Sequence, residues 1–366
     1  MKILTCIISK ITYKIPITYF KTVSKYYIFV LVSLLRKIAF PISLIYALVV
    51  YLRNKLFDFG IFTSKKFQTP IICVGNLSVG GTGKTPMIEY LIDYFKEDIK
   101  VAVLSRGYKR KSIGHIFAST ESTVEDLGDE PYQLHSKFPR VAVAVDADRR
   151  NGISKLEKEL KPDVILLDDA FQHRKVNADL NILLTSYGHL YLDDWYLPTG
   201  NLRDSRSQAK RANYIVVTKC PRGISLNERH LIKERLAIKN YQKVLFSYLR
   251  YDNELKSIEN NLSLSALHDR SITLVTGIAN PKPLVQYLED ENLSFDHLAY
   301  KDHHFFTSRE IQEFNSKDLV LTTEKDYMRL QGKVKNMFYI RVSHAFLDDG
   351  GAVLKKGLDD FMKPNS

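Results

Sequence analysis

The chain has 366 residues with 45% hydrophobic and 26% charged residues, the composition of a folded globular protein, which excludes a largely disordered one. Its length favours two domains, each with its own core, and its net charge is +12. Cys6, Cys73 and Cys220 lie far apart without a Cys/His cluster, which excludes a disulfide framework and a zinc site and favours a reducing compartment.

The positive charge is concentrated at the N-terminus. Residues 1–66 contain eleven lysines and arginines and one acid, Asp58, which gives this segment a net charge of +10. Long apolar runs at 27–35 and 38–52 separate the charges. Anionic headgroups attract each nearby Lys or Arg by about 1 kcal/mol, and apolar side chains insert at the headgroup boundary. The segment therefore predicts a membrane-associating arm, and its lopsided charge argues against nucleic-acid binding.

Whether the arm spans the membrane is a separate question. The run 38–52 is shorter than the roughly 20 residues that a spanning helix needs, and it contains Pro41. A window over 26–52 would place Arg36 and Lys37 near the bilayer centre. We therefore expect an interfacial anchor. The alternatives are a single span, a cleaved signal peptide and a core helix beneath the next domain.

From residue 70 onward, short apolar runs alternate with helical patterns, which is typical of α/β domains with a mainly parallel sheet. A second alternation follows a polar, charged stretch at 222–239. We predict a basic apolar arm (1–66), a first α/β domain (67–225) and a second (226–366). The expected strands are 71–74, 101–104, 141–145, 164–167, 182–184, 214–217, 244–249, 272–275, 293–298, 319–322 and 337–342. The expected helices are 85–95, 129–138, 149–160 and one that begins with a capping box at Thr307 and Glu310.

Residues 78–85 read SVGGTGKT between an expected strand and an expected helix. This is the context of a P-loop, in which backbone N–H groups and a helix N-terminus bind phosphates. Lys84 would reach the β- and γ-phosphates, and the Thr85 hydroxyl would bind Mg²⁺. Ser78 replaces the first Gly of the motif. The predicted nucleotide-binding residues are Ser78, Val79, Gly80, Gly81, Thr82, Gly83, Lys84 and Thr85.

The expected strand 164–167 runs into two carboxylates, Asp168 and Asp169. A P-loop site needs an acid at the end of a neighbouring strand to hold Mg²⁺, so we predict that this pair supplies it. The sequence Thr218-Lys219-Cys220-Pro221 also follows a strand, in the manner of a guanine-reading motif. Pro221 stands where that motif requires Asp, which argues against a GTPase.

Nine segments occur in an order that identifies a family. They are VGNLSVGGTGKTP (74–86), SRGY (105–108), GDEP (128–131), DR (148–149), DDAFQH (168–173), LPTGNLRD (197–204), TGIANP (276–281), DH (302–303) and TEKD (323–326). From about residue 34 to its C-terminus, the chain resembles the tetraacyldisaccharide 4′-kinases (lipid A 4′-kinases) of Gram-negative bacteria.

The resemblance implies transfer of the γ-phosphate of ATP to the 4′-hydroxyl of a tetraacylated glucosamine disaccharide 1-phosphate, giving the 1,4′-bisphosphate (lipid IVA) of lipid A biosynthesis. It implies two α/β/α sandwich domains, the first P-loop NTPase-like, preceded by a membrane-associating helix at the cytoplasmic face of the inner membrane, as a peripheral protein or with a single anchor. ATP and Mg²⁺ are the expected cofactors. The lipid disaccharide and anionic lipids are the expected partners, with neither nucleic acid nor an obligate protein partner. The alternative is a P-loop switch or metallochaperone-type ATPase acting on a protein partner.

The resemblance also implies residue roles. Asp129 would accept the hydroxyl proton, paired with His303 from the second domain, and Lys84 would complete the catalytic set. Arginines suit an acceptor that already carries a phosphate. The implied metal-binding residues are Thr85, Asp168, Asp169 and Asp204, the last where the family usually has Glu. The implied substrate contacts are Asn76, Arg106, Tyr108, Arg149, His173 and Arg203.

Overall fold

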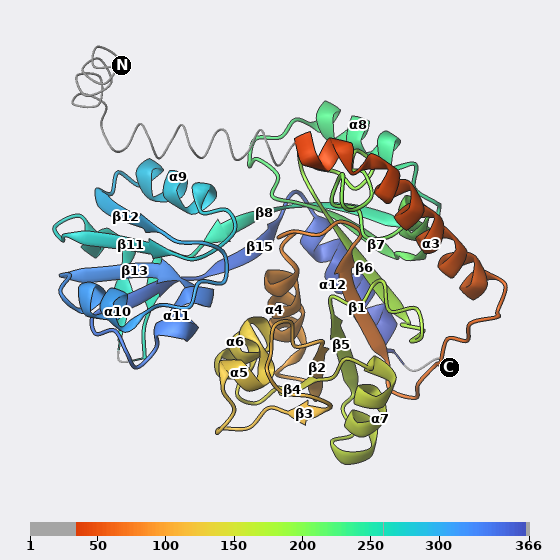
Figure 1. Cartoon of the computed structure of the whole chain (residues 1–366), viewed down its shortest axis with the longest axis horizontal. Helices are drawn as coiled ribbons and strands as arrows, with labels where there is room; N and C mark the ends of the chain where they lie inside the picture. The colour runs from red at the N-terminus through yellow and green to blue at the C-terminus, as the bar shows by residue number, and fades with distance from the viewer. Residues whose placement is uncertain (1–33, 259, 364–366) are drawn as a thin grey trace, which may run out of the picture.

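A computed structural model of the chain describes residues 34–258 and 260–363; residues 1–33 of the predicted arm lie outside the described residues. The described chain forms two sheets (Figure 1). In the first sheet the inner strands run parallel and both edge strands run antiparallel. In spatial order its strands are β15 (Val342–Phe346), β8 (Lys243–Tyr251), β7 (Tyr214–Thr218), β6 (Leu180–Ser186), β1 (Ile71–Asn76), β5 (Val164–Asp168), β2 (Val101–Ser105), β4 (Ala142–Val145) and β3 (Ile116–Phe117).

Helices cover both faces of this sheet, because its central strands are apolar at nearly every position and must be buried on both sides. Met87, Leu134 and Leu354 bring three helices onto one face, and Ile153 and Ile232 bring two onto the other. The first group is α4 (Lys84–Phe95), α6 (Asp129–Lys137) and α12 (Gly350–Met362); the second is α7 (Arg149–Glu159) and α8 (Leu226–Leu236) with the 3₁₀ helix Arg206–Arg211. The expected α/β/α layering of the first domain is confirmed.

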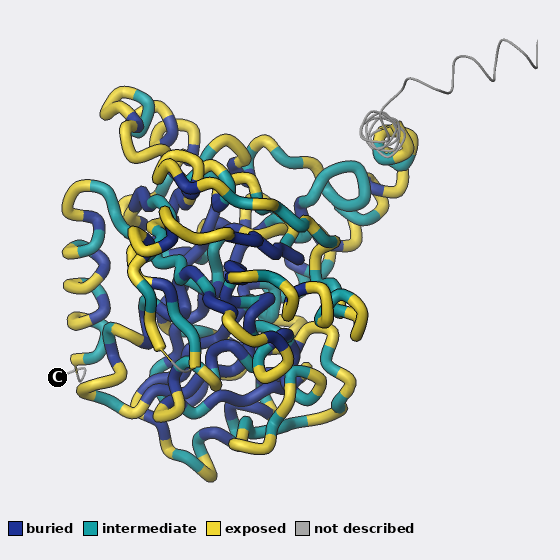
Figure 2. The backbone as a smooth tube through the Cα atoms, turned by 90° about the vertical axis from the view of Figure 1, so that its left-hand side faces the viewer, coloured by how far each residue is buried: buried dark blue, intermediate teal, exposed yellow. Residues whose placement is uncertain are grey.

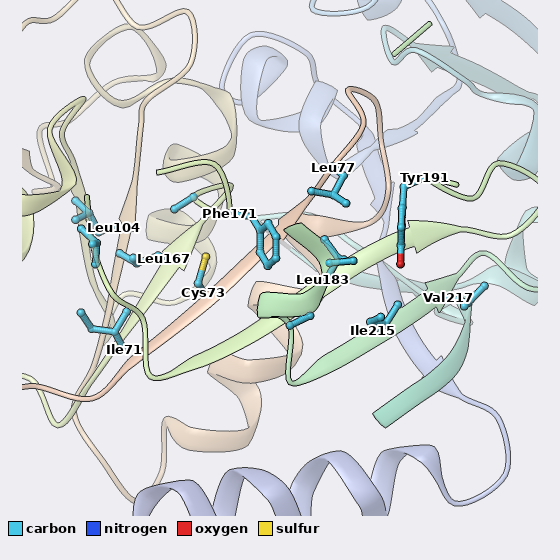
Figure 3. Packing of buried hydrophobic residues seen from close by; sticks show 14 of the residues in the cluster. Ile71, Cys73, Leu77, Leu104, Leu167, Phe171, Leu183, Tyr191, Ile215 and Val217 are labelled. Atoms are coloured by element: carbon cyan, nitrogen blue, oxygen red, sulfur yellow. The ribbon is translucent and has the colours of Figure 1, made fainter. Parts of the chain in front are cut away.

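Part of this core also positions the segment that follows β5. Phe171 is fully buried beside Cys73, as Figure 3 shows. A Cβ atom on Gly75 would lie 2.6 Å from the Cβ of Phe171, so the glycine allows this close approach. The end of β1 and the segment after β5 are thereby packed directly together.

The second sheet carries helices on both faces as well. Strands β11 to β14 are parallel, and a short hairpin extends one edge. The capping box expected at Thr307 and Glu310 is confirmed. In spatial order the strands are β10 (Asn261–Ser263), β9 (Glu254–Lys256), β14 (Met337–Ile340), β13 (Leu319–Thr323), β11 (Ile272–Thr276) and β12 (Phe295–Ala299). The helices are α9 (Lys282–Asp290) with the 3₁₀ turn Leu264–Leu267 on one face, and α10 (Ser308–Asn315) with α11 (Glu324–Leu330) on the other. Figure 2 shows the buried residues gathered inside the molecule.

The sheet topology corrects the domain boundary expected at residue 226. β8 pairs in parallel with β7, and β15 pairs with β8, so both strands belong to the first sheet. The single strand expected at 337–342 is two strands, β14 and β15, which lie in different sheets on either side of Arg341. The polar stretch 222–239 contains α8 and is not a linker. An apolar run has the same pattern whichever sheet it joins, so the sequence could not assign these strands.

Ion pairs join the two domains where α11 lies against α6. The Lys137 ammonium contacts carboxylate oxygens of Glu89 at 2.6 Å and of Glu324 at 2.9 Å, and all three side chains are less than a tenth exposed. Burial and the negative charge of Glu324 raise the pKa of Glu89 to about 7. Lys325 Nζ lies 2.6 Å from Glu130 Oε1. Charges buried this deeply require their partners, so the two domains depend on each other here.

Helix α3 (Phe40–Asp58) lies on the first domain (Figure 1), with Ser43, Val50 and Asn54 buried. The hydroxyls of Ser43 and Tyr46 donate to Thr199 Oγ1 and to the Arg203 carbonyl, and the Asn54 amide donates to Asp204. Its length and composition would allow it to cross a membrane. The large apolar residues that are more than half exposed on this helix are Ile42, Leu44, Ile45, Leu48, Val49, Tyr51 and Leu52.

Candidate active site

The loop between β1 and α4 contains the predicted phosphate-binding residues 78–85. Gly80 and Gly83 have φ angles of +123° and +88°, which side chains with a Cβ rarely adopt. Helix α4 begins immediately after Gly83, and its first residues are Lys84 and Thr85. The unpaired N–H groups of this first turn and the positive end of the helix dipole therefore lie beside the loop. Thr85 is buried at this end of α4.

Side chains from three strands hold the loop from outside the motif. The Asn76 amide donates to Thr82 Oγ1 at 3.0 Å, and the Thr218 hydroxyl donates to the Thr82 carbonyl at 2.8 Å. His344 Nε2 donates to the Gly83 carbonyl at 2.9 Å. These contacts come from β1, β7 and β15, so the conformation of the loop depends on the order of the sheet.

His344 is a neutral imidazole in this position. A carbonyl only accepts hydrogen bonds, so Nε2 carries the proton, and Nδ1 accepts from the Ser247 hydroxyl at 3.0 Å. Burial lowers the pKa of His344 to about 4. Protonation would add a second N–H that faces the hydroxyl of Ser247 and a charge that the site does not compensate.

The predicted acid pair lies beside the loop, because β5 pairs directly with β1 and places Asp168 opposite Val74. Asp168 is buried, and the Ser105 hydroxyl donates to its Oδ2 at 3.1 Å. Burial, with the negative charges of Glu130 and Asp169, raises the pKa of Asp168 to about 7.

Asp169 is paired with cations. The Arg203 guanidinium binds both of its carboxylate oxygens, and Lys84 Nζ lies 3.8 Å from Oδ1. Although burial opposes its ionisation, Lys84 and Arg203 hold the pKa of Asp169 below its ordinary value. The two neighbouring carboxyls therefore differ in their affinity for a proton.

The acid pair fits a divalent cation. Asp168 Oδ1 is buried and accepts no hydrogen bond from the described residues, although a buried carboxylate oxygen normally has a partner. Within 34–258 and 260–363, no three His, Cys, Asp or Glu side chains form a cluster that could hold a metal alone. A Mg²⁺ ion that takes most of its ligands from phosphate and water, with one or two carboxylates, requires no larger cluster.

A second group of charges forms where α6 meets the second domain. Asp129 Oδ2 lies 2.5 Å from His303 Nδ1, and Arg329 donates to both oxygens of Asp129 at 3.0 and 2.7 Å. Burial opposes ionisation, but His303 and Arg329 outweigh it and hold the pKa of Asp129 below its ordinary range. The ring of Tyr108 lies 6.2 Å from that of His303, edge to face. The predicted pair of Asp129 and His303 is therefore brought together.

Glu130 connects the two groups of charges. It follows Asp129 in the first turn of α6 and pairs with Lys325, while its negative charge acts on Asp168. Burial opposes its ionisation, but Lys325 and Lys84 lower the pKa of Glu130. Glu130 therefore links the pair of Asp129 and His303, its neighbour in α6, to the acid pair through its charge.

The other predicted substrate contacts differ in their exposure. Arg106 and Tyr108 are exposed after β2, whereas Arg149 is buried and donates to the Asp146 carbonyl at 3.0 Å. Burial, with the positive charge of Arg149, lowers the pKa of His173 to about 4. Asn76 and Arg203 bind each other, and both contact the loop or the acid pair.

The structure places Asp204 away from the metal-binding role implied for it. Asp204 is fully buried beneath α3, where Arg53 and Asn54 donate to its two oxygens at 2.9 and 2.7 Å. The backbone N–H of Ser205 also donates to Oδ1. With these donors the carboxylate anchors α3 to the first domain.

Several residues of the site were not predicted from the sequence. Glu130 and Lys325 lie inside segments that identified the family, but nothing in the sequence indicated their pairing across the domains. Ser105 also lies in such a segment (105–108), but nothing there indicated its contact with Asp168. Arg329 and His344 gave no signal, because each acts through a contact between distant strands or helices.

A glycine-rich loop between a parallel strand and a helix, beside an acid pair on the next strand, is the arrangement of P-loop α/β proteins. The tetraacyldisaccharide-1-P 4′-kinase family model matches residues 35–361, and the chain belongs to this family. Similarity to individual members covers most of the chain.

A tetraacyldisaccharide 4′-kinase of Flavobacterium johnsoniae is 48% identical over 86% of the chain and 94% of its own length. One of Bacteroides thetaiotaomicron is 48% identical over 81% of the chain and 83% of its own length. Among solved structures, LpxK from Aquifex aeolicus, an "apo" form in complex with ATP, has a TM-score of 0.75 and 32% identity, covering 90% of the chain and all of that structure.

The stability of the protein should depend on pH through His344. Its folded pKa of about 4 lies below the ordinary value of 6.5, so the unfolded chain takes up the proton first as the pH falls. The contribution of neutral His344 to the free energy of unfolding is fully present above pH 6.5 and is lost as the pH falls toward 4. Between pH 7 and pH 5, the wild type should lose about 2 kcal/mol more unfolding free energy than His344→Gln. Urea denaturation measures this difference, and equal losses in both proteins would contradict it.

Proposed function

We propose that this chain transfers the γ-phosphate of ATP to the 4′-hydroxyl of a tetraacylated glucosamine disaccharide 1-phosphate. One observation carries the proposal: in a chain of the 4′-kinase family, the loop 78–85 lies beside Asp168 and Asp169, with Lys84 3.8 Å from Asp169. The names of the relatives and the ATP bound by LpxK from Aquifex aeolicus support it.

The loop and α4 bind the triphosphate. Backbone N–H groups at 79–85 and the ammonium of Lys84 donate to its oxygens, so Lys84 exchanges its contact with Asp169 for phosphate. Thr85, Asp168 and Asp169 would hold Mg²⁺, which would supply positive charge to the phosphate oxygens. Because the pKa of Asp168 is raised to about 7, this carboxyl would have to be ionised to serve as a ligand.

The pair of Asp129 and His303 accepts the proton of the sugar hydroxyl. Nδ1 of His303 donates to Asp129, which leaves the lone pair of Nε2 free to take the proton of the sugar hydroxyl. Asp129 itself can accept it only after Arg329 withdraws, because Arg329 donates to both carboxylate oxygens. Docking of the second domain therefore assembles the acceptor. The proposed substrate contacts are Asn76, Arg106, Tyr108, Arg149, His173 and Arg203.

Helix α3 attaches the enzyme to the cytoplasmic face of the inner membrane, where its lipid acceptor lies. Ser43 and Asn54 face the protein, and most of the apolar residues, apart from the buried Val50, face outward, the reverse of the pattern in a helix that covers a soluble core. Ring contacts from Phe40 to Trp195 and from Tyr46 to Tyr196 continue this surface onto the first domain. The basic residues of the arm attract anionic lipids.

Purified protein in detergent should move radiolabelled γ-phosphate from ATP to the tetraacyl disaccharide 1-phosphate. Lys84→Ala should abolish transfer without unfolding the protein, because Lys84 is only partly buried and pairs with one carboxylate. Thin-layer chromatography of the lipid product measures transfer. An active preparation that labels other acceptors but never this lipid would refute the proposed function.

Substitution of the proton acceptor should affect turnover more than nucleotide binding. Asp129→Asn and His303→Gln should each lower kcat by about 10² or more, with the affinity for MgATP retained. Because the two residues act as one unit, the double variant should be no slower than the slower single variant. Wild-type turnover in either single variant would remove that residue from the mechanism.

Membrane attachment by α3 can be tested with a matched pair of isoleucines. Ile45 on α3 and Ile258 in the second domain are 65% and 66% exposed, so substitution removes similar apolar area from each. Ile45→Glu should weaken binding to vesicles containing phosphatidylglycerol about 10-fold, and Ile258→Glu should not. Cosedimentation measures the bound fraction; an equal effect of both substitutions would count against this orientation of α3.

A further inference from the structure

Lys219 lies at the phosphate loop, and the mechanism above does not use it. It follows β7, with a φ of +59° that turns the chain sharply at the end of the strand. Its Nζ lies 4.0 Å from the position that a Cβ on Gly81 would occupy. The preceding residue, Thr218, donates to the Thr82 carbonyl at 2.8 Å, which fixes this corner against the loop.

The topology places Lys219 on the side of the loop opposite the acid pair. The strand order β7-β6-β1-β5 puts Asp168 and Asp169 on one side of the loop and the end of β7 on the other. A triphosphate in the loop therefore meets the acid pair on its β5 side. On its β7 side it meets Lys219.

The charges around Lys219 are unbalanced while no anion is bound. Lys84 has a carboxylate within 4 Å, Asp169, but in the described part of the chain no carboxylate lies within that distance of Lys219. Burial of the amine and the positive charge of Lys84 lower the pKa of Lys219. The residue nevertheless stays accessible to solvent. Two ammonium groups at one loop repel each other, and an anion between them removes that repulsion.

The surrounding sequence leaves this lysine without a base-reading role. In the guanine-reading motif the residue two positions after the lysine is Asp, and here it is Pro221. Lys219 therefore lies at the edge of the nucleotide site, but the Asp that would bind a guanine base is missing from the following residues. A flexible ammonium group in this position suits a phosphate oxygen.

We propose that Lys219 binds the polyphosphate of the nucleotide as a second cation, opposite the acid pair and beside Lys84. This inference rests on the nucleotide binding in the proposed function and adds a residue to it. It gives the triphosphate a positive group on its β7 side that does not depend on Mg²⁺. The ammonium donates to phosphate oxygens and contacts neither the base nor the ribose.

Calorimetry on the full-length protein with MgATP and with inorganic tripolyphosphate tests the inference. Lys219→Met removes the charge and keeps the length of the side chain; it should weaken both ligands by the same factor, about 10-fold or more. Lys219→Arg should restore most of the affinity. Lys158→Met, at an exposed position on α7, is the matched control and should bind both ligands like the wild type.

Wild-type affinity in Lys219→Met would overturn the inference. So would a loss for ATP with none for tripolyphosphate, because that result would place the contact on the ribose or base. The thermal unfolding midpoint of each variant verifies folding, and Lys219→Gln serves as a second neutral variant. If the wild type binds MgATP but never phosphorylates the lipid, the proposed function fails while the role of Lys219 stands or falls on these affinities.

Discussion

Backbone amides can bind a phosphate group only if the loop that carries them is held open in one conformation. Here that constraint is met by side chains outside the motif. Asn76, Thr218 and His344 come from three strands, and each forms a hydrogen bond to the loop. Strand β15, which carries His344, begins where the chain returns from the second sheet. The hydrogen bond from His344 to the Gly83 carbonyl therefore connects the loop to β15, the strand that directly follows the last strand of the second sheet.

Ion pairs between α6 and α11 also connect the two domains. Asp129 and Glu130 are consecutive in the first turn of α6, and each meets a cation from α11, Arg329 and Lys325 respectively. His303 and Arg329 of the second domain therefore lower the pKa of Asp129, and Lys325 lowers the pKa of Glu130, whose negative charge acts on Asp168. Separation of the domains would leave these carboxylates without their partners. The ionisation of the two carboxylates therefore depends on the docking of the domains.

Helix α3 shows how a tertiary contact changes the interpretation of a sequence position. Asp204 lies in a segment that identified the family, and its expected role was to bind metal. In the structure, Arg53 and Asn54 of α3 donate hydrogen bonds to its two oxygens. This carboxylate therefore holds α3 on the first domain, with most of the apolar residues of the helix exposed. The polar residues of an apolar helix are normally its solvated side, but here they are its attachment to the protein.

The sequence by itself predicted the loop 78–85 with its neighbouring acid pair, most of the strands and the family, because these depend on local patterns: glycines before Gly-Lys-Thr, and apolar runs that end in acids. Only the tertiary structure decided which sheet β8 and β15 join, where Asp204 lies, and how Arg329, His344 and Lys219 reach the site. Those outcomes depend on pairing between residues far apart in the chain. A strand or a charged residue looks the same in sequence whichever distant partner it meets.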